Sequence, residues 1–267
     1  MLHARTLLFM LPGVVAFLAL PAMGRRHETG FLNRVVTVSG VDDRYQVYVP
    51  RNWTKKQKWP VILFLHGAGE RGDDGLIQTE VGIGTAIRRH PDRFPAIVVM
   101  PQCRATVWWL EASMQAQALR ALDDALKEFK GDPARVYLTG LSMGGYATWE
   151  LGAKVTGRFA ALVPVCGGVI LPRHVTEREP GMPPAEATGD PYAAAARGIG
   201  QTPVWAFHGS DDPAVPATES RKLVEALQAA GGDVRYTEYP DVGHNSWEKA
   251  YAEAELMPWL LAQRLGK

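Results

Sequence analysis

The feature that most constrains the fold is a series of short, unbroken apolar runs separated by helical patterns. Five runs of strand length lie at 60–67, 96–101, 135–140, 160–165 and 203–209. A sixth run, of more mixed composition, follows at 234–240. Such runs are typical of strands buried on both faces of a parallel sheet. Alternation with helices predicts an α/β protein, with a mainly parallel central sheet and helices on both faces.

Helical spacing is found in two of the intervals between these runs and in the C-terminal residues after the last run. Apolar residues recur every three or four positions from 119 to 129, and Gly131 is the predicted end of that helix. A second helix is predicted around 223–227. A third is predicted from 247 to 265, with a bend at Pro258.

Two further segments differ from this alternation. Residues 34–40 and 44–50 alternate with period two and predict an antiparallel hairpin with its turn at 41–43. Residues 167–202 contain five prolines and little periodicity. A segment of that length without clear elements is either an insertion without a role or a wall or partial cap over the site.

The N-terminal residues 1–24 predict a secretory signal peptide. Arg5 precedes an uncharged apolar run from Leu7 to Leu20, and small residues at Ala22 and Gly24 suit cleavage after Gly24. An uncleaved anchor and an incorrect start are the alternatives. We therefore expect a single domain at 25–267 in a secreted or periplasmic protein, with no stable membrane partner after cleavage.

Charge and composition exclude some kinds of partner. The 267 residues are 46% hydrophobic and 21% charged, and 29 Lys and Arg nearly balance 28 Asp and Glu. This balance gives no reason to expect a nucleic acid partner. The sequence carries neither a metal-ligand cluster nor a phosphate-binding loop, so we expect no metal and no cofactor. Cys103 and Cys166 each follow an apolar run, and both a disulfide and two buried thiols remain open.

The segment "GLSMGG" carries the strongest chemical signal. Gly140, Ser142 and Gly144 form a G-x-S-x-G motif between the strand at 135–139 and a helix predicted from about residue 143. That context is the nucleophile elbow, a sharp turn that exposes a serine hydroxyl above the sheet. We expect the glycines to lie where a side chain would collide with neighbouring backbone.

A serine nucleophile needs a base, and the base needs an acid to orient it. Asp212 follows the strand that ends at 207, and His244 follows the last strand, so both are expected at the carboxyl end of the sheet. The order Ser142, Asp212, His244 is that of the α/β-hydrolases. By contrast, His66 and His208 each begin a His-Gly turn, where a structural hydrogen bond is the expected role.

Two adjacent aspartates compete for the role of the acid. Pro213 restricts Asp212 to an extended backbone, which suits a carboxylate held in one direction. Asp211 is then expected to cap the turn by accepting backbone N–H groups. Asp241, three residues before His244, is the next candidate.

A tetrahedral intermediate also needs hydrogen-bond donors. The Met143 amide, directly after the serine, is one candidate, and the Ala68 amide is the second, with Gly69 as its alternative. Glu70 and Arg71 either pair to hold this turn or remain solvated.

Three tryptophans flank the motifs. Trp108, Trp109 and Trp247 either line an aromatic acyl or sugar pocket or pack in the core.

Several ordered motifs together resemble a known family. "LFLHGAGERG", "GLSMGGYATWELG", "WAFHGSDDPAVP" and "GHNSWEKAY" resemble the phospholipase/carboxylesterase and dienelactone-hydrolase-related branch of the α/β-hydrolase superfamily. Within it, the chain is similar to secreted esterases and peptidases, feruloyl and acetylxylan esterases and polyhydroxybutyrate depolymerases. The resemblance implies a Ser142, Asp212 and His244 triad and an oxyanion hole from the Ala68 and Met143 amides.

The predicted function is therefore a secreted serine esterase acting through an acyl-enzyme on a small-molecule or polysaccharide-linked ester. A serine nucleophile argues against dienelactone hydrolases proper, which use cysteine. One alternative is a peptidase resembling prolyl-oligopeptidase catalytic domains, and another is a catalytically silent binding protein on the same fold.

Overall fold

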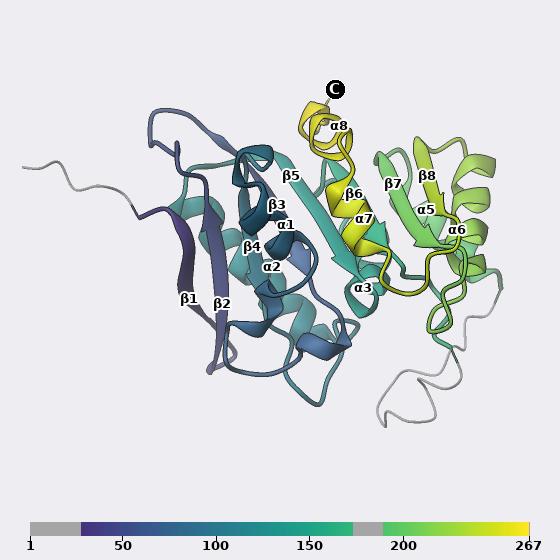
Figure 1. Cartoon of the computed structure of the whole chain (residues 1–267), viewed down its shortest axis with the longest axis horizontal. Coiled ribbons are helices and arrows are strands. Elements are labelled where there is room, and N and C mark those ends of the chain that lie inside the picture. Colours follow the sequence, from purple (N-terminus) through teal and green to yellow (C-terminus); the bar gives the residue numbers. More distant parts are fainter. Residues whose placement is uncertain (1–27, 173–188, 267) are drawn as a thin grey trace, which may run out of the picture.

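The computed structural model describes residues 28–172 and 189–266, and their core is one eight-stranded sheet. The strand order is β1-β2-β4-β3-β5-β6-β7-β8 (Figure 1). Strands β1 and β2 are antiparallel to each other, β2 is antiparallel to β4, and all other neighbours are parallel. The strands are β1 (Gly30–Val38), β2 (Val41–Val49), β3 (Trp59–Leu65), β4 (Ile97–Pro101), β5 (Gly131–Leu141), β6 (Ala161–Val165), β7 (Val204–Gly209) and β8 (Val234–Tyr239). The predicted mainly parallel sheet is confirmed.

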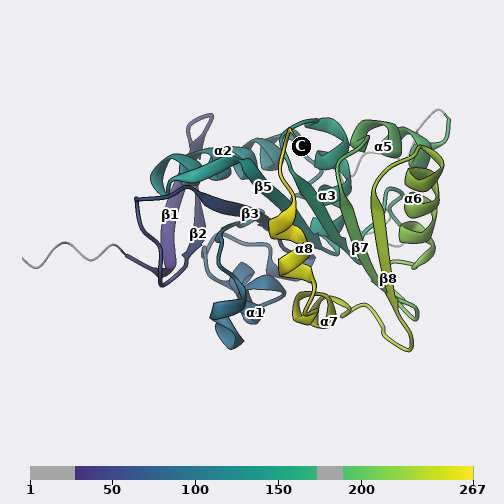
Figure 2. The ribbon, with the colours of Figure 1, turned by 90° about the horizontal axis from the view of Figure 1, so that it is seen from above.

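Helices cover both faces of this sheet. Those of the described residues are α1 (Ile83–Arg89), α2 (Ala112–Glu128), α3 (Met143–Lys154), α5 (Pro191–Ile199), α6 (Thr218–Ala229), α7 (Trp247–Ala252) and α8 (Leu256–Ala262). Seen from above, α2, α3, α5 and α6 lie on one face and α1, α7 and α8 on the other (Figure 2). Each group contributes to its own buried apolar cluster, so the sheet separates two cores. This arrangement explains why β3, β4 and β6 are apolar and buried along their whole length.

The antiparallel hairpin is present, but its turn lies earlier than predicted. Val38 pairs with Val41, so Ser39 and Gly40 form a two-residue turn. Both have positive φ, at 51° and 79°, as a tight hairpin turn of the mirror-image type requires. The predicted turn at 41–43 is wrong because these residues belong to β2 and pair with residues 36–38 of β1.

Two predicted helix ends also differ. Lys130, at φ 58°, takes the left-handed position after α2, and Gly131 already begins β5. The C-terminal helix does not bend at Pro258 but divides before it, into α7 and α8. Pro258 lies in the first turn of α8, where its missing N–H costs no intrahelical hydrogen bond.

The segment 167–202 contains a helix that we did not predict. Helix α5 begins after Asp190, whose carboxylate accepts hydrogen bonds from the Tyr192 and Ala193 amides, and Pro191 is its first residue. An Asp cap followed by proline is a recognised start signal, so the sequence contained the information. Residues 173–188 of this segment and the predicted signal peptide at 1–24 lie outside the described residues. None of the helices in the described ranges is long and apolar enough to span a membrane.

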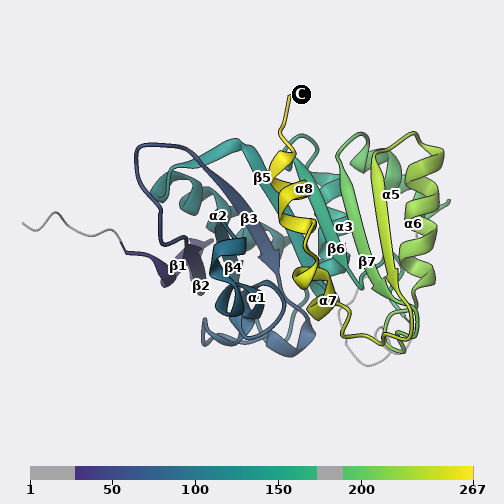
Figure 3. The same ribbon diagram turned by 45° about the horizontal axis from the view of Figure 1, so that its top comes forward.

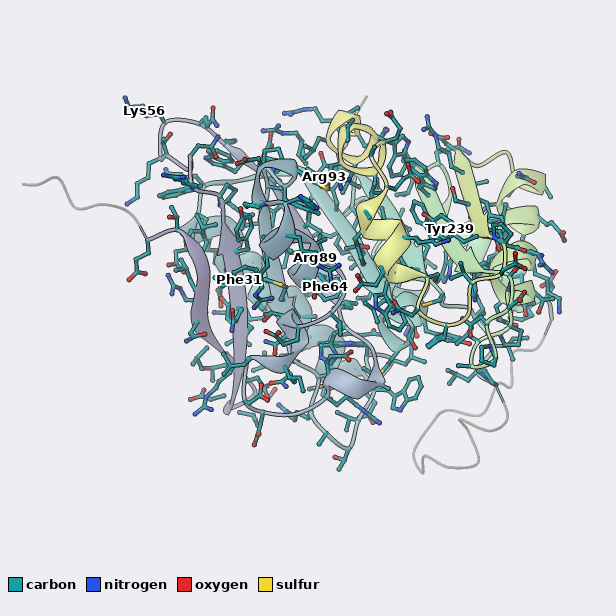
Figure 4. The ribbon with its side chains drawn as sticks, viewed as in Figure 1. Phe31, Lys56, Phe64, Arg89, Arg93 and Tyr239 are labelled. Carbon is teal, nitrogen blue, oxygen red and sulfur yellow. The ribbon has the colours of Figure 1, made fainter. Side chains whose placement is uncertain are left out.

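The loops after the parallel strands gather at one edge of the sheet, at the bottom of Figure 3. Helix α7, which begins just after His244, is anchored to the rest of the fold near this edge. The Thr139 hydroxyl of β5 lies 2.9 Å from the Tyr251 hydroxyl, a buried link between sheet and helix. Arg89 and Arg93 lie beside this helix (Figure 4). Arg89 pairs with Glu248 at 2.8 Å, and Arg93 donates to the Ala252 carbonyl at 3.0 Å.

Candidate active site

Ser142 occupies a strained turn between β5 and α3. Its φ of 52° and ψ of −117° lie where residues with a side chain are uncommon. A methyl group at Gly144 would lie 1.9 Å from the Leu65 carbonyl oxygen, and one at Gly140 would lie 2.4 Å from the Gly144 oxygen. The interpretation that these glycines avoid collisions with backbone is confirmed. Without side chains at Gly140 and Gly144, α3 packs directly against the end of β3, and Ser142 is held just before the first turn of α3.

A chain of two hydrogen bonds connects three predicted site residues. Ser142 Oγ lies 2.8 Å from His244 Nε2, and His244 Nδ1 lies 2.7 Å from Asp212 Oδ2. A carboxylate only accepts, so His244 carries its proton on Nδ1, and Nε2 is left to accept the serine proton. The side chain of His244 is 25% exposed and that of Asp212 is fully buried.

The environment of Asp212 keeps its carboxyl ionised. Burial by itself would raise the pKa of Asp212. Hydrogen bonds from His208, His244 and the Val215 amide outweigh burial and hold the pKa well below its usual range. Asp212 Oδ1 accepts from the Ala214 and Val215 amides, both at 2.9 Å.

The neighbouring Asp211 does not cap this turn in the way we predicted. Its carboxylate accepts from the Ser210 hydroxyl at 2.7 Å and is exposed, while Asp212 itself receives the turn amides. One carboxylate can do both, because Oδ1 faces the turn and Oδ2 faces His244.

The predicted oxyanion donors lie on two adjacent turns. Ala68 is the first residue of a 3-10 turn after β3, and Met143 is the first residue of α3. First-turn N–H groups have no partner within their own helix, so both are available to an anion. The turns are close together, because a methyl group at Gly67 would lie 3.7 Å from Ser142 Cβ.

Buried His66 supports the first of these turns. The Cys103 amide donates to His66 Nε2 at 2.9 Å, so Nδ1 carries the proton and donates to the Gly67 carbonyl at 2.6 Å. Burial lowers the pKa of His66 to about 4, which keeps the ring neutral. The predicted structural role of His66 is confirmed.

The same turn includes Glu70 and Arg71. Arg71 Nε donates to the Ala68 carbonyl at 3.0 Å, which closes the turn. Burial raises the pKa of the Glu70 carboxyl, and hydrogen bonds from the Gly67 and Glu70 amides oppose that shift. The alternative in which Glu70 and Arg71 both remain solvated is therefore not observed.

The three candidate pocket tryptophans separate into different roles. Trp109 is 1% exposed, packs against the His66 ring and donates from Nε1 to the His66 carbonyl at 3.0 Å. Of the two alternatives, packing in the core is the one observed for Trp109, beneath the turn that begins at Ala68. Trp108 is also largely buried, with the Arg71 guanidinium 5.9 Å from its ring. Trp247 is half-buried and lies edge-on to His244 at 5.4 Å.

The two cysteines are free and buried. They follow β4 and β6, which β3 and β5 separate in the sheet. Three strand spacings amount to roughly 14 Å, beyond the Cα separation of about 7 Å that a disulfide tolerates. The alternative of two buried thiols is the one observed.

Cys166 also lies close to the candidate triad. Among the described residues, its sulfur and the ligand atoms of Asp212 and His244 lie within 4.8 Å of one another, as metal ligands would. Burial raises the pKa of the Cys166 thiol, and nearby Asp212 raises it further, so the sulfur keeps its proton. Asp212 and His244 are already hydrogen-bonded to each other.

Comparison with known proteins agrees with this geometry. A sequence model of the prolyl oligopeptidase family matches residues 112–264, more than half of the chain, and includes all three residues of the hydrogen-bonded chain. The crystal structure of a thermostable esterase superposes with a TM-score of 0.73 at 33% identity, covering 88% of this chain and 63% of that one.

Two curated relatives have different activities in their names. Acyl-protein thioesterase 1 of Gibberella zeae is 28% identical over 46% of this chain and 46% of its own length. Dipeptidyl peptidase 4 of Sus scrofa is 25% identical over 79% of this chain and 29% of its own length. The chain thus spans less than half the length of these two relatives. With its eight-stranded sheet, its elbow and the family match over 112–264, the chain belongs to the prolyl oligopeptidase family of the α/β-hydrolase superfamily.

Proposed function

We propose that the protein is a serine hydrolase that cleaves carboxylic esters through an acyl-enzyme. The observation that carries this proposal is the hydrogen-bonded chain from Ser142 through His244 to Asp212, with the serine in a strained elbow. This is the arrangement in which a neutral imidazole removes the proton of an attacking hydroxyl.

In the first half-reaction, Ser142 Oγ bonds to the ester carbonyl carbon and passes its proton to His244 Nε2. The carbonyl oxygen becomes an oxyanion, which the Ala68 and Met143 amides would stabilise. Collapse of this intermediate breaks the bond to the alcohol oxygen, and His244 returns its proton to that leaving group. Asp212 stays ionised and stabilises the imidazolium.

In the second half-reaction, water replaces the alcohol. His244 takes a proton from the water, whose oxygen bonds to the acyl carbon. Collapse of this second tetrahedral intermediate breaks the bond between the acyl carbon and Ser142 Oγ, and His244 returns the proton to Oγ. The products are one carboxylic acid and one alcohol, and the enzyme regains its starting state. No residue outside the Ser142 site is needed for the proton transfers.

The 33% identity to an esterase over most of the chain favours an ester. Membership of the prolyl oligopeptidase family favours a second candidate, a peptidase that uses the same three residues on an amide bond. The acyl-enzyme chemistry is the same in both cases, and only the leaving group differs, as an alcohol or an amine. A catalytically silent binding protein is the third candidate.

One set of assays separates the three candidates. We expect purified protein to hydrolyse p-nitrophenyl acetate far faster than a peptide p-nitroanilide, and Ser142→Ala to lose about four to six powers of ten in kcat. Faster cleavage of the anilide would assign the peptidase. Absence of turnover together with absence of fluorophosphonate labelling at Ser142 would assign the binding protein. Acetylated xylan, feruloyl esters, short triglycerides and a polyester then define the substrate class.

Export is a separate part of the proposal. The apolar run that ends at Ala22 and Gly24 supports a cleaved signal and a secreted or periplasmic enzyme. N-terminal sequencing of exported protein should start near Arg25. Exported material that still begins at Met1 would contradict cleavage.

A further inference from the structure

A second histidine contacts the candidate acid. His208, on β7, is fully buried, and its Nε2 lies 2.9 Å from the Val215 carbonyl oxygen and 3.3 Å from Asp212 Oδ2. Its Nδ1 lies 2.7 Å from the hydroxyl of Ser220 on α6. Both ring nitrogens therefore have partners, and one partner is the oxygen that His244 also contacts.

The partners determine where the His208 proton lies. The Val215 carbonyl can only accept, so Nε2 carries the proton. That N–H is hydrogen-bonded to the Val215 carbonyl, and Asp212 Oδ2 lies 3.3 Å from the same nitrogen. In the neutral ring Nδ1 is then left as an acceptor for the Ser220 hydroxyl, which also lies 3.4 Å from the Gly167 carbonyl oxygen.

The other acidic groups around His208 have partners elsewhere. Glu238 lies opposite it in the register of β8, but pairs with Arg221 at 2.5 Å. Glu219 on α6 accepts the Tyr192 hydroxyl at 2.6 Å. Cys166, at the end of β6, is held protonated by burial. The carboxylate that faces the His208 N–H is that of Asp212.

The Asp212 carboxylate is thus held at both oxygens. The Ala214 and Val215 amides donate to Oδ1. His208 Nε2 lies 3.3 Å from Oδ2, which is the oxygen that also contacts His244. The His208 N–H thus lies between the Val215 carbonyl and Oδ2 of the same turn. Rotation of the carboxylate would break the amide hydrogen bonds at Oδ1 and move Oδ2 away from the His208 N–H.

We propose that His208 is a positioning residue for the reaction, which fixes the Asp212 carboxylate against His244 through its Nε2 proton. This inference rests on the proposed function of Ser142, His244 and Asp212. His208 touches neither the substrate nor the serine and acts through Asp212.

Two amide substitutions separate the two ring nitrogens. The side-chain nitrogen of glutamine lies three bonds from Cβ, as Nε2 of histidine does, so His208→Gln keeps a donor for Asp212. The nitrogen of asparagine lies two bonds from Cβ, as Nδ1 does, so His208→Asn keeps only the group that faces Ser220. Because asparagine is also the smaller side chain at this buried position, urea unfolding of both variants measures the packing loss, and the double variants test the path through Asp212.

For His208→Asn we expect kcat of ester hydrolysis to fall about tenfold with KM nearly unchanged, as for loss of one hydrogen bond to a charged group. Removal of a donor leaves more negative charge on Oδ2 for the imidazolium, which favours protonated His244. The acid-side midpoint of the kcat/KM profile should therefore rise by up to about one pH unit. His208→Gln should stay within about threefold of wild type and keep the wild-type midpoint.

Double variants test whether the effect acts through Asp212. The loss caused by His208→Asn should disappear in an Asp212→Asn background and persist in an Asp211→Asn background. Equal losses in both backgrounds, or equal kinetics of the Asn and Gln variants, would overturn the proposal. If His208→Asn does not fold, Ser220→Ala, which frees Nδ1, should give a smaller shift of the midpoint in the same direction, and no shift would overturn the proposal.

A measurement without substrate separates this inference from the proposed function. The proton between His244 Nδ1 and Asp212 gives a low-field proton NMR resonance, which should move further downfield in His208→Asn and not in His208→Gln. An inactive wild type with this pattern intact would contradict the esterase but not the positioning role. An active wild type whose resonance and midpoint ignore His208→Asn would contradict the positioning role alone.

Discussion

The Oδ2 atom of Asp212 lies 2.7 Å from His244 Nδ1, whereas the adjacent Asp211 carboxylate is exposed and hydrogen-bonded to Ser210. One position along the chain thus separates a buried carboxylate that orients the histidine from a solvated one. The difference arises because the turn directs Asp212 inward, where Oδ1 receives two backbone amides.

Matched substitutions of these two aspartates should have very different effects. Asp212→Asn preserves shape but places an amide against His244 and favours the wrong tautomer of the imidazole. The equivalent substitution in a serine protease triad lowers kcat by about 10⁴-fold. We expect a loss of that order in kcat. Asp211→Asn should cost less than about tenfold, measured with the same ester at neutral pH. An inactive Asp211→Asn, with Asp212→Asn active, would reverse the assignment, and unchanged activity in both would direct attention to Asp241.

The elbow glycine should be intolerant of a single methyl group. Gly144→Ala brings a Cβ to 1.9 Å from the Leu65 carbonyl oxygen, and the nearest atoms all belong to the backbone of Leu65 and His66, which cannot give way as a flexible side chain would. We expect a loss of about 3 kcal/mol or more in the free energy of unfolding, at the upper end for overpacking. Gly69→Ala is the control for stability, because a methyl group there meets no atom within 4 Å. Equal urea midpoints for the two variants would contradict the tight contact.

Buried His66 should make stability depend on pH. Burial lowers its pKa to about 4, from 6.5 for the unconstrained side chain. Between these values the unfolded chain binds a proton that the folded protein does not. The free energy of unfolding therefore rises with pH from about 4 to 6.5, by about 3 kcal/mol at most, and this contribution is complete above 6.5.

The variant that tests this is His66→Asn, which keeps a nitrogen donor for the Gly67 carbonyl. Urea unfolding at several pH values should give a less stable protein at pH 7 with a shallower slope between pH 4.5 and 6.5. A slope equal to that of wild type would assign the pH dependence to other groups.

Trp109 and Trp247 should respond differently to truncation. Trp109 is buried beneath the turn that begins at Ala68, so Trp109→Ala should cost about 3–5 kcal/mol in the free energy of unfolding. Half-buried Trp247 lies against His244, so Trp247→Ala should change KM and kcat for aromatic esters more than stability. Trp247→Phe, which keeps a ring, is the matched control. If Trp247→Ala lowers the free energy of unfolding strongly and leaves the ester preference unchanged, Trp247 has a structural role and does not contact the substrate.

Features that depend on a few neighbouring residues could be read from the sequence. The buried strands, the elbow at Ser142 and the order of Ser142, Asp212 and His244 follow from apolar runs and from motifs that immediately follow them. Helix α5 was missed although Asp190 and Pro191 mark its start, because prolines and charges around it obscured the periodicity. The division before Pro258 was missed because proline suits the first turn of a helix as well as a bend.

By itself, the sequence determined the α/β class, the strand positions and which side chains reach the carboxyl end of the sheet. The tertiary structure alone decided the rest: the separation of Cys103 from Cys166, the core position of Trp109, and the contact of His208 with Asp212. Those outcomes depend on strand order and on side-chain direction between segments far apart in the chain. Local patterns specify periodicity and turns, whereas such contacts arise only when β6, β7 and α6 pack together.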